Sequence, residues 1–340
     1  MPSTLNYSDI LNLKNKILVD VRSPKEYNEA TIPGAINIPV LLDDERVEVG
    51  TLYVNKKISE SKLFAVESIS KRLPEIFRQF LNLSETYDNI IVFCARGGYR
   101  SKSISSFLNS LDIKNTRINN GYKGYRNYVL NNIDNLISTI SPIVLYGNTG
   151  CGKTKIILEL SDKGFPVIDL EGLAIHRGSI LGAVGLPEQP TQKMFENILF
   201  EKLERYKNKY VFFEGESRRI GKILLPETLY EKMATSINIK ITAPIGYRIE
   251  NLVEEYASVE NKPAIAEAIK RMNKYLSNKT VEVLLNALDN NDYAYIAKEL
   301  CINYYDKKYK NRVNVFDYEF TNNNTEKVTN EIISKTKKYF

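Results

Sequence analysis

Short apolar runs alternate with amphipathic segments along this chain of 340 residues. Residues 17–21, 36–39 and 90–93 are short and largely apolar, and turn residues follow the first of them, so they are predicted to be strands. Residues 60–82 and about 123–138 are predicted to be helical, and Ile104, Phe107, Leu108 and Leu111 recur at helical spacing between them. This alternation predicts an α/β fold.

The alternation begins again after a polar junction at residues 138–142. Further strands are expected at 143–146, 167–169, 210–213 and 237–241. Residues 246–310 are predicted to be mostly helical, with tyrosines and lysines interleaved. We therefore expect two α/β domains, at 1–138 and 139–340, the second with a helical C-terminal region at about 246–310.

Composition limits the class of protein only broadly. Hydrophobic residues at 43% and charged residues at 26% are ordinary for a soluble globular protein. No apolar run is as long as a membrane span, and no export signal opens the chain, so a cytoplasmic protein without a membrane partner is expected. The net charge of +6 fits a polyanionic partner such as RNA. Three widely spaced cysteines predict neither a disulfide framework nor a zinc site.

A loop with a thiol and two arginines follows the strand at 90–93. Its candidate residues are Cys94, Arg96, Gly97, Gly98, Arg100 and Ser101. The arginines and the N-terminus of the following helix would stabilise a thiolate and hold an anion, while the glycines let backbone amides converge. A buried cysteine that merely ends a strand is the alternative, but arginines and glycines at this density do not suit a protein core.

A second loop follows the strand at 143–146 and matches the P-loop pattern Gly-x-x-x-x-Gly-Lys-Thr in full. Its phosphate-binding candidates are Gly147, Gly150, Gly152, Lys153 and Thr154. The amides cradle phosphate oxygens, the lysine neutralises charge, and Thr154 is a ligand if Mg²⁺ is bound. Because the loop reads phosphates rather than bases, any diphosphate ester fits it.

The first half of the chain resembles a rhodanese domain. The resemblance rests on residues 20–27 (Asp-Val-Arg-Ser-Pro-Lys-Glu-Tyr), residues 32–39 (Ile-Pro-Gly-Ala-Ile-Asn-Ile-Pro) and the cysteine loop. The Gly-His that usually precedes Ile-Pro-Gly-Ala is Ala30-Thr31 here. In that family the loop cysteine carries sulfur or selenium. Cys94 and Arg100 enclose five residues, as in rhodanese-like phosphatases, and a wide loop suits a phosphorylated anion.

Further segments extend the resemblance to bacterial tRNA 2-selenouridine synthases. They are residues 49–53, 169–179, 189–196 and 214–221, in that order along the chain. Two positions depart from the family pattern. Ala95 stands where the family usually has tryptophan, and Gly215 stands where it usually has aspartate. The second departure leaves Glu214 and Glu216 as the carboxylates of that segment.

The resemblance implies a two-step exchange at the wobble uridine of tRNA, with geranyl diphosphate and selenophosphate as co-substrates. In this scheme Cys94 handles selenium, and Lys153 with its loop holds the diphosphate. Contacts to the donor or the uridine are expected from Asp169, Glu171, His176, Arg177, Glu214, Glu216, Arg218 and Arg219. A selenophosphate-supplying enzyme is a further expected partner. For His176 a hydrogen-bonded packing role is the alternative, and for the two adjacent arginines a surface ion pair.

A stretch near the C-terminus mixes aromatic rings with cations and suits single-stranded anticodon bases. Its members are Tyr305, Lys307, Lys308, Tyr309 and Lys310. A solvated helix face is the alternative. For the whole chain three other functions stay open: an ATP-dependent kinase fused to a rhodanese domain, a rhodanese-like phosphatase, and a non-catalytic carrier of persulfide sulfur.

Overall fold

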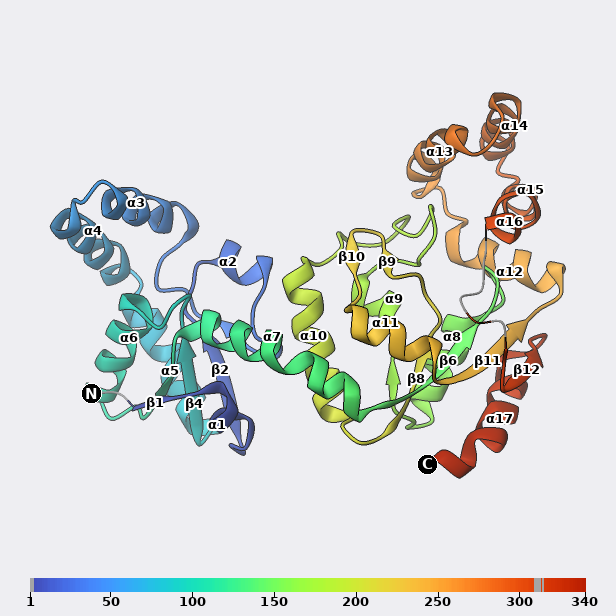
Figure 1. Ribbon diagram of the computed structural model, residues 1–340. Coiled ribbons are helices and arrows are strands. Elements are labelled where there is room, and N and C mark those ends of the chain that lie inside the picture. The colour runs from blue at the N-terminus through green and yellow to red at the C-terminus, as the bar shows by residue number, and fades with distance from the viewer. Residues whose placement is uncertain (1–2, 309–312, 314) are drawn as a thin grey trace. The chain divides into compact units, whose positions relative to one another are not determined.

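The computed structural model describes residues 3–308, 313 and 315–340 and divides into two compact units (Figure 1). The first contains Met1–Ile133 together with Glu196–Glu201, and the second contains the rest. The expected boundary after residue 138 thus differs from the observed one, and the first unit is not contiguous. The reason is a buried amide: Asn197 donates to the carbonyl of Thr31 at 2.8 Å, deep in the first unit.

The first unit is built on a parallel five-stranded sheet in the order β1-β5-β4-β2-β3. Its strands are β1 (Ser3–Leu5), β2 (Lys16–Asp20), β3 (Ile36–Asn37), β4 (Asn89–Phe93) and β5 (Thr116–Ile118). Its helices are α1 (Tyr7–Leu11), α2 (Pro24–Glu29), α3 (Asp43–Val54), α4 (Ile58–Ser70), α5 (Leu73–Thr86), α6 (Tyr99–Ser110) and the start of α7 (Gly121–Thr139). Asp20 pairs with Phe93 in register, so β2 and β4 end together where the cysteine loop begins.

The helix expected over residues 60–82 is two helices, α4 and α5. Pro74 lies in the first turn of α5, where its missing N–H costs nothing, and a proline there cannot continue a helix from the preceding residues. Phe80 on α5 is fully buried against the sheet residues Val19 and Val92. The break therefore lets the second helix turn its apolar face to the core.

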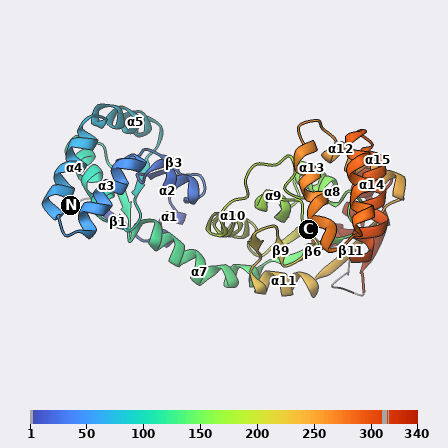
Figure 2. The same cartoon turned by 90° about the horizontal axis from the view of Figure 1, so that it is seen from above.

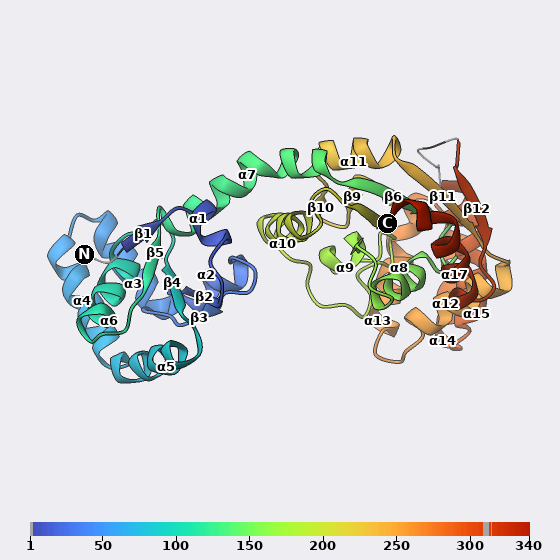
Figure 3. The same cartoon turned by 90° about the horizontal axis from the view of Figure 1, so that it is seen from below.

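The second unit contains another parallel five-stranded sheet, in the order β12-β11-β6-β8-β7. Figure 3 labels β12, β11 and β6 of this sheet. Its strands are β6 (Ser141–Tyr146), β7 (Val167–Ile168), β8 (Tyr210–Glu214), β11 (Ile237–Thr242) and β12 (Tyr318–Thr321), and β9 (Arg219–Ile220) with β10 (Ile223–Leu224) forms a small antiparallel pair. The unit also contains the helices α8 (Lys153–Asp162), α9 (Leu170–Ala174), α11 (Glu227–Ala234) and α17 (Thr325–Thr336), and both ends of α10 (Gln192–Arg205), whose middle belongs to the first unit. Leu145 pairs with Glu214, so the phosphate loop and this glutamate share one edge of the sheet.

The helices of the region expected at 246–310 lie together (Figure 2). Their buried apolar side chains form one hydrophobic cluster together with Leu181 and Val184. The region consists of α12 (Ile245–Tyr256), α13 (Lys262–Arg271), α14 (Asn278–Asp289), α15 (Tyr293–Leu300), a π-helix (Cys301–Tyr305) and α16 (Asp306–Lys308). Ile269, Met272 and Leu284 are fully buried in it. Among the helices described, none is both long and apolar enough to cross a membrane.

Candidate functional site

Cys94 lies between the end of β4 and the start of α6, at the junction expected from the sequence. Its side chain is buried, with only 3% of the residue exposed, and its Sγ is 3.2 Å from the Oγ of Ser101. Unpaired N–H groups at a helix N-terminus favour a nearby negative charge. The position therefore suits a thiolate or an anion bound beside it.

Helix α7 fixes the shape of the cysteine loop. The N–H of Tyr122 donates to the carbonyl of Cys94 at 2.8 Å, and that of Lys123 donates to the carbonyl of Ala95 at 3.0 Å. Gly121, with φ of +54°, comes so close that an added Cβ would lie 2.0 Å from the Cys94 oxygen. Only glycine fits there. Sequence reasoning missed this residue because its role depends on a loop more than twenty residues earlier.

Glu26, on α2, holds Arg100 in a half-buried bidentate ion pair. Burial works against both charges, yet the pairing lowers the pKa of Glu26 and raises the pKa of Arg100. Arg96 is exposed at the rim of the loop. Of the two predicted anion-binding arginines, one is thus fixed by a carboxylate and the other faces solvent. Glu26 was not predicted as a site residue, although it lies in the rhodanese-like segment 20–27.

A second ion pair braces the end of β2. Arg22 and Asp20 are buried and 2.6 Å apart, and the Arg22 guanidinium lies 4.2 Å from the ring centre of Tyr122. Thr31, at the position where the rhodanese pattern usually has histidine, donates its hydroxyl to Asp20 at 2.8 Å. The departure from the family pattern is therefore accommodated by a hydrogen bond to the same buried carboxylate.

The phosphate loop runs from the end of β6 to the start of α8. Gly150 and Gly152 have φ of +81° and +85°, the left-handed conformation that glycine adopts without strain. Lys153 donates from Nζ to the carbonyl of Gly147 at 2.8 Å. The five predicted residues are thus brought together in a curled loop at a helix N-terminus, a geometry that holds phosphate.

Residues from the helical region support this loop, and none of them was predicted. Arg248 donates to the carbonyl of Thr149 at 2.9 Å, and Asn251 donates to that of Gly150 at 2.9 Å. Asp306 accepts from Arg248 at 2.7 Å and from Asn148 at 2.9 Å. Signals for these contacts are absent from local sequence because the partners are between 58 and 158 residues apart.

Glu171, Glu214 and Glu216 form a carboxylate cluster beside the loop, with one oxygen from each within 4.8 Å of the others. Burial raises the pKa of Glu214 to about 8, assisted by the charges of Asp169 and Glu216, and it also raises the pKa of the other two. Both oxygens of Glu214 are buried without a geometrically ideal hydrogen-bond partner among the described residues. Hard oxygen ligands of this kind fit Mg²⁺.

Gly178 and Gly215 lie against this cluster. A Cβ at Gly178, whose φ is +61°, would lie 2.5 Å from Oε2 of Glu216. A Cβ at Gly215 would lie 2.4 Å from the ring of Tyr146. The ring of Tyr146 thus occupies the space that a side chain at position 215 would need. The third carboxylate of the cluster comes from Glu171.

A cavity of about 630 Å³ opens over the phosphate loop and the carboxylates. The predicted residues that line it are Gly150, Gly152, Lys153, Thr154, Glu171, Arg177, Glu216 and Tyr305, with Lys308. Arg177 is 2.5 Å from Glu255, a lining residue that was not predicted. The cavity thus combines cations, carboxylates and aromatic rings.

Two further predicted contact residues, His176 and Asp169, hydrogen-bond within their own segment. The Nδ1 atom of His176 accepts from the N–H of Gly178 at 3.1 Å, and burial lowers the pKa of this histidine. Asp169 accepts from the N–H of Gly172 at 2.7 Å and caps α9. Neither lines the cavity. Both hydrogen bonds lie in the segment that carries Glu171 and Arg177, and a contact of either residue with the donor or the uridine stays a prediction.

The predicted residues Arg218, Arg219, Lys307 and Lys308 each have a different environment. Arg218 pairs with Glu227 at 3.2 Å, and Arg219 is exposed on β9. Lys308 lies 3.0 Å from the ring centre of Tyr275, and Lys307 donates to Asn303 at 3.1 Å. The predicted tRNA contacts Tyr309 and Lys310 lie outside the described residues.

Comparison with known proteins agrees with both halves of this description. Residues 140–339 match the family described as the tRNA 2-selenouridine synthase AAA domain, and residues 6–131 match the rhodanese-like domain. The chain is 34% identical over 268 residues to tRNA 2-selenouridine synthase of Nitrosomonas eutropha, covering 77% of this chain and 68% of that protein. For the Nitrosomonas europaea protein of the same name the identity is 35%, over 70% of this chain and 63% of that one. For the Bdellovibrio bacteriovorus protein it is 34%, over 75% and 70%. This chain belongs to the tRNA 2-selenouridine synthase family.

Proposed function

We propose that this chain converts 2-thiouridine at the wobble position of tRNA into 2-selenouridine through an S-geranyl intermediate. Geranyl diphosphate and selenophosphate are the co-substrates, a selenophosphate-forming enzyme supplies the second, and the reaction takes place in the cytoplasm. The observation that carries the proposal is the presence of two anion-binding loops in one chain, one with a thiol and one with a lysine. Family membership supports the tRNA substrate and the selenium product.

The phosphate loop serves the first step. The thiocarbonyl sulfur of the uridine attacks C1 of the geranyl group, the carbon–oxygen bond breaks, and diphosphate leaves. Lys153 and the loop amides stabilise the negative charge that develops on the departing diphosphate. Mg²⁺, when bound, adds further charge neutralisation, and Thr154 with the three glutamates would hold it.

The cysteine loop serves the second step. Selenium forms a bond to C2 of the uridine, and the geranylated sulfur leaves as a neutral thiol after protonation. Water then cleaves the selenium–phosphorus bond and releases phosphate. Alkylation is needed first because an unmodified thiocarbonyl sulfur is a poor leaving group. Cys94 is assigned to this step, with Arg96 and the N-terminus of α6 holding selenophosphate.

The test is a reconstitution with purified chain, tRNA containing 2-thiouridine, and each co-substrate in turn, followed by mass spectrometry of the nucleosides. Geranyl diphosphate alone should give the geranylated nucleoside, and later addition of selenophosphate should convert it to 2-selenouridine. Selenium incorporation at full rate without any geranyl donor would contradict the order of steps. ATP hydrolysis that depends on Lys153, with unchanged tRNA, would favour the kinase instead.

A further inference from the structure

The cavity over the phosphate loop has two chemically different walls. One is polar and contains Lys153, Thr154 and the carboxylates. The other is largely apolar, and its members are Leu158, Ile180, Leu252, Tyr256, Tyr304 and Tyr305. A ligand that fills this space therefore needs an anionic head and an apolar body.

The apolar wall continues into a smaller pocket between α12, α13 and α15. The two spaces share Leu252, Tyr256 and Tyr305. The remaining lining residues of the small pocket are Leu181, Ile265, Tyr293, Ile296, Ala297 and Leu300, and none of the lining residues is charged. Its volume is about 30 Å³, room for about two water-sized groups. It would hold the end of a hydrocarbon chain and little more.

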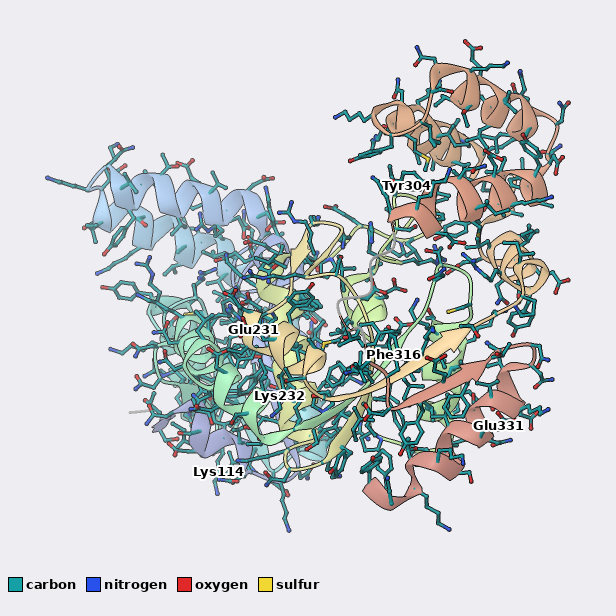
Figure 4. The ribbon with its side chains drawn as sticks, turned by 45° about the vertical axis from the view of Figure 1, so that its right-hand side comes forward. Lys114, Glu231, Lys232, Tyr304, Phe316 and Glu331 are labelled. Carbon is teal, nitrogen blue, oxygen red and sulfur yellow. The ribbon has the colours of Figure 1, made fainter. Side chains whose placement is uncertain are left out.

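The tyrosines Tyr256, Tyr304 and Tyr305 of this wall are buried. Burial raises the pKa of Tyr256 and of Tyr305 above the ordinary tyrosine value, so both stay protonated at neutral pH. Tyr304, marked in Figure 4, packs edge-on against Tyr305 with ring centres 5.2 Å apart. Because the rings are buried and packed together, they contribute apolar surface to the wall.

The wall is held at a fixed separation from the phosphate loop. Arg248 is buried and bridges the two, donating to the carbonyl of Thr149 at 2.9 Å and to Asp306 at 2.7 Å. Asp306 directly follows the π-helix that carries Tyr304 and Tyr305. Short π-helical segments are found frequently at functional sites. The geometry relating head group to tail is therefore set before a ligand binds.

We propose that this apolar wall binds the hydrocarbon chain of the prenyl diphosphate donor and that the small pocket around Ile296 limits its length to that of geranyl. The inference rests on the proposed function for the identity of the donor. Each buried methylene should strengthen binding by about fourfold. Affinity should therefore rise from inorganic diphosphate through dimethylallyl diphosphate to geranyl diphosphate, with no further gain for farnesyl diphosphate.

Calorimetric titration of the full chain with those four ligands and with ADP tests the inference. Ile296→Phe should fill the small pocket and weaken geranyl diphosphate about tenfold while leaving inorganic diphosphate unchanged. Ile296→Ala should enlarge it and shift the preference toward farnesyl diphosphate. Leu284→Ala is the matched control, because Leu284 is a fully buried aliphatic residue of the same helical cluster that lines neither cavity.

The outcomes separate this inference from the proposed function. Equal affinity for inorganic diphosphate and geranyl diphosphate would overturn the tail site, even if geranylated tRNA forms. Chain-length selection that Ile296→Phe removes would support it, even if no tRNA product is found. Tighter binding of ADP than of geranyl diphosphate, with ADP weakened by Ile296→Phe, would show that the wall holds a nucleobase and would overturn it.

Discussion

The two anion-binding loops occupy equivalent places in their sheets, yet other elements give them different surroundings. Each follows the carboxyl end of a parallel strand and precedes a helix. The cysteine loop is bordered by the ion pair between Glu26 and Arg100. The phosphate loop is bordered by a cluster of three glutamates and an apolar wall. The comparison shows that two loops with the same place in a parallel sheet acquire different surroundings from neighbours that are distant in sequence.

The largest expected effect comes from removing the thiol. Cys94→Ser should lower selenium incorporation by about 10³-fold or more, because Cys94 is assigned to the selenium step, while geranylation continues. Mass spectrometry of tRNA should then show the S-geranyl nucleoside building up. Cys301→Ala is the control, since Cys301 is buried in the other unit and lines neither cavity. Absence of the geranylated nucleoside in the Cys94 variant would refute the division of labour between the loops.

Removing the lysine should have the complementary effect. Lys153→Ala should slow geranyl transfer by about 10²–10³-fold, because a preorganised charge on the departing diphosphate is lost. Selenation of tRNA that already carries S-geranyl-2-thiouridine should stay unchanged in the same variant. Lys163→Ala, at the far end of α8, provides the control. Equal loss in both assays would mean that the loops do not act separately.

The carboxylate cluster beside the phosphate loop predicts that the stability of the fold depends on pH. Since the folded-state pKa of Glu214 is raised to about 8, the native chain binds more protons than the unfolded chain between pH 4.5 and 8. Stability should therefore fall as the pH rises through this window, by up to about 5 kcal/mol, or about 1.4 kcal/mol for each pH unit. Mg²⁺ should restore part of it at the upper end.

Thermal unfolding of the wild type and Glu214→Gln, with and without Mg²⁺, measures this effect. The variant should be less sensitive to pH and should gain less from Mg²⁺. Glu319→Gln, which changes an exposed carboxylate on the same unit, should behave like the wild type. A Mg²⁺ response that is identical in all three proteins would count against the cation site.

The smallest effect concerns the ion pair at the cysteine loop. Glu26→Gln leaves the charge of Arg100 uncompensated, so inorganic phosphate should inhibit the selenium step about threefold more strongly. Because the pKa of Glu26 is lowered in the folded state, its carboxylate stabilises the fold at pH values above the pKa that Glu26 has in the unfolded chain. The wild type should lose this stabilisation as the pH falls through the folded-state pKa, and the variant should lack it at any pH. Glu60→Gln, an exposed acid on α4, is the control. Weaker phosphate inhibition in the Glu26 variant would show that the ion pair maintains the conformation of the cysteine loop and does not act by neutralising Arg100.

Several features could be predicted because they depend on residues next to one another. Both strand–loop–helix units were predicted, since an apolar strand, a glycine-rich turn and a helical pattern stand in sequence at each. The break between α4 and α5 was missed, although Pro74 marked it. The edge strand β12 was also missed, because its half-exposed residues have no continuous apolar run. The ligand contacts predicted for His176 and Asp169 stay predictions, since the hydrogen bonds that these residues make within their segment do not test them.

The sequence by itself determined where the thiol, the lysine and the glycines stand, because a loop's local conformation follows from the few residues that form it. Only the tertiary structure decided what surrounds them. Arg100 meets Glu26 across 74 residues, and Arg248 meets Thr149 across 99. Such pairs form when two distant segments pack on the same sheet edge, and their choice depends on burial and charge compensation over the whole unit. The apolar wall is of the same kind, since it exists only where the helical cluster folds against the phosphate loop.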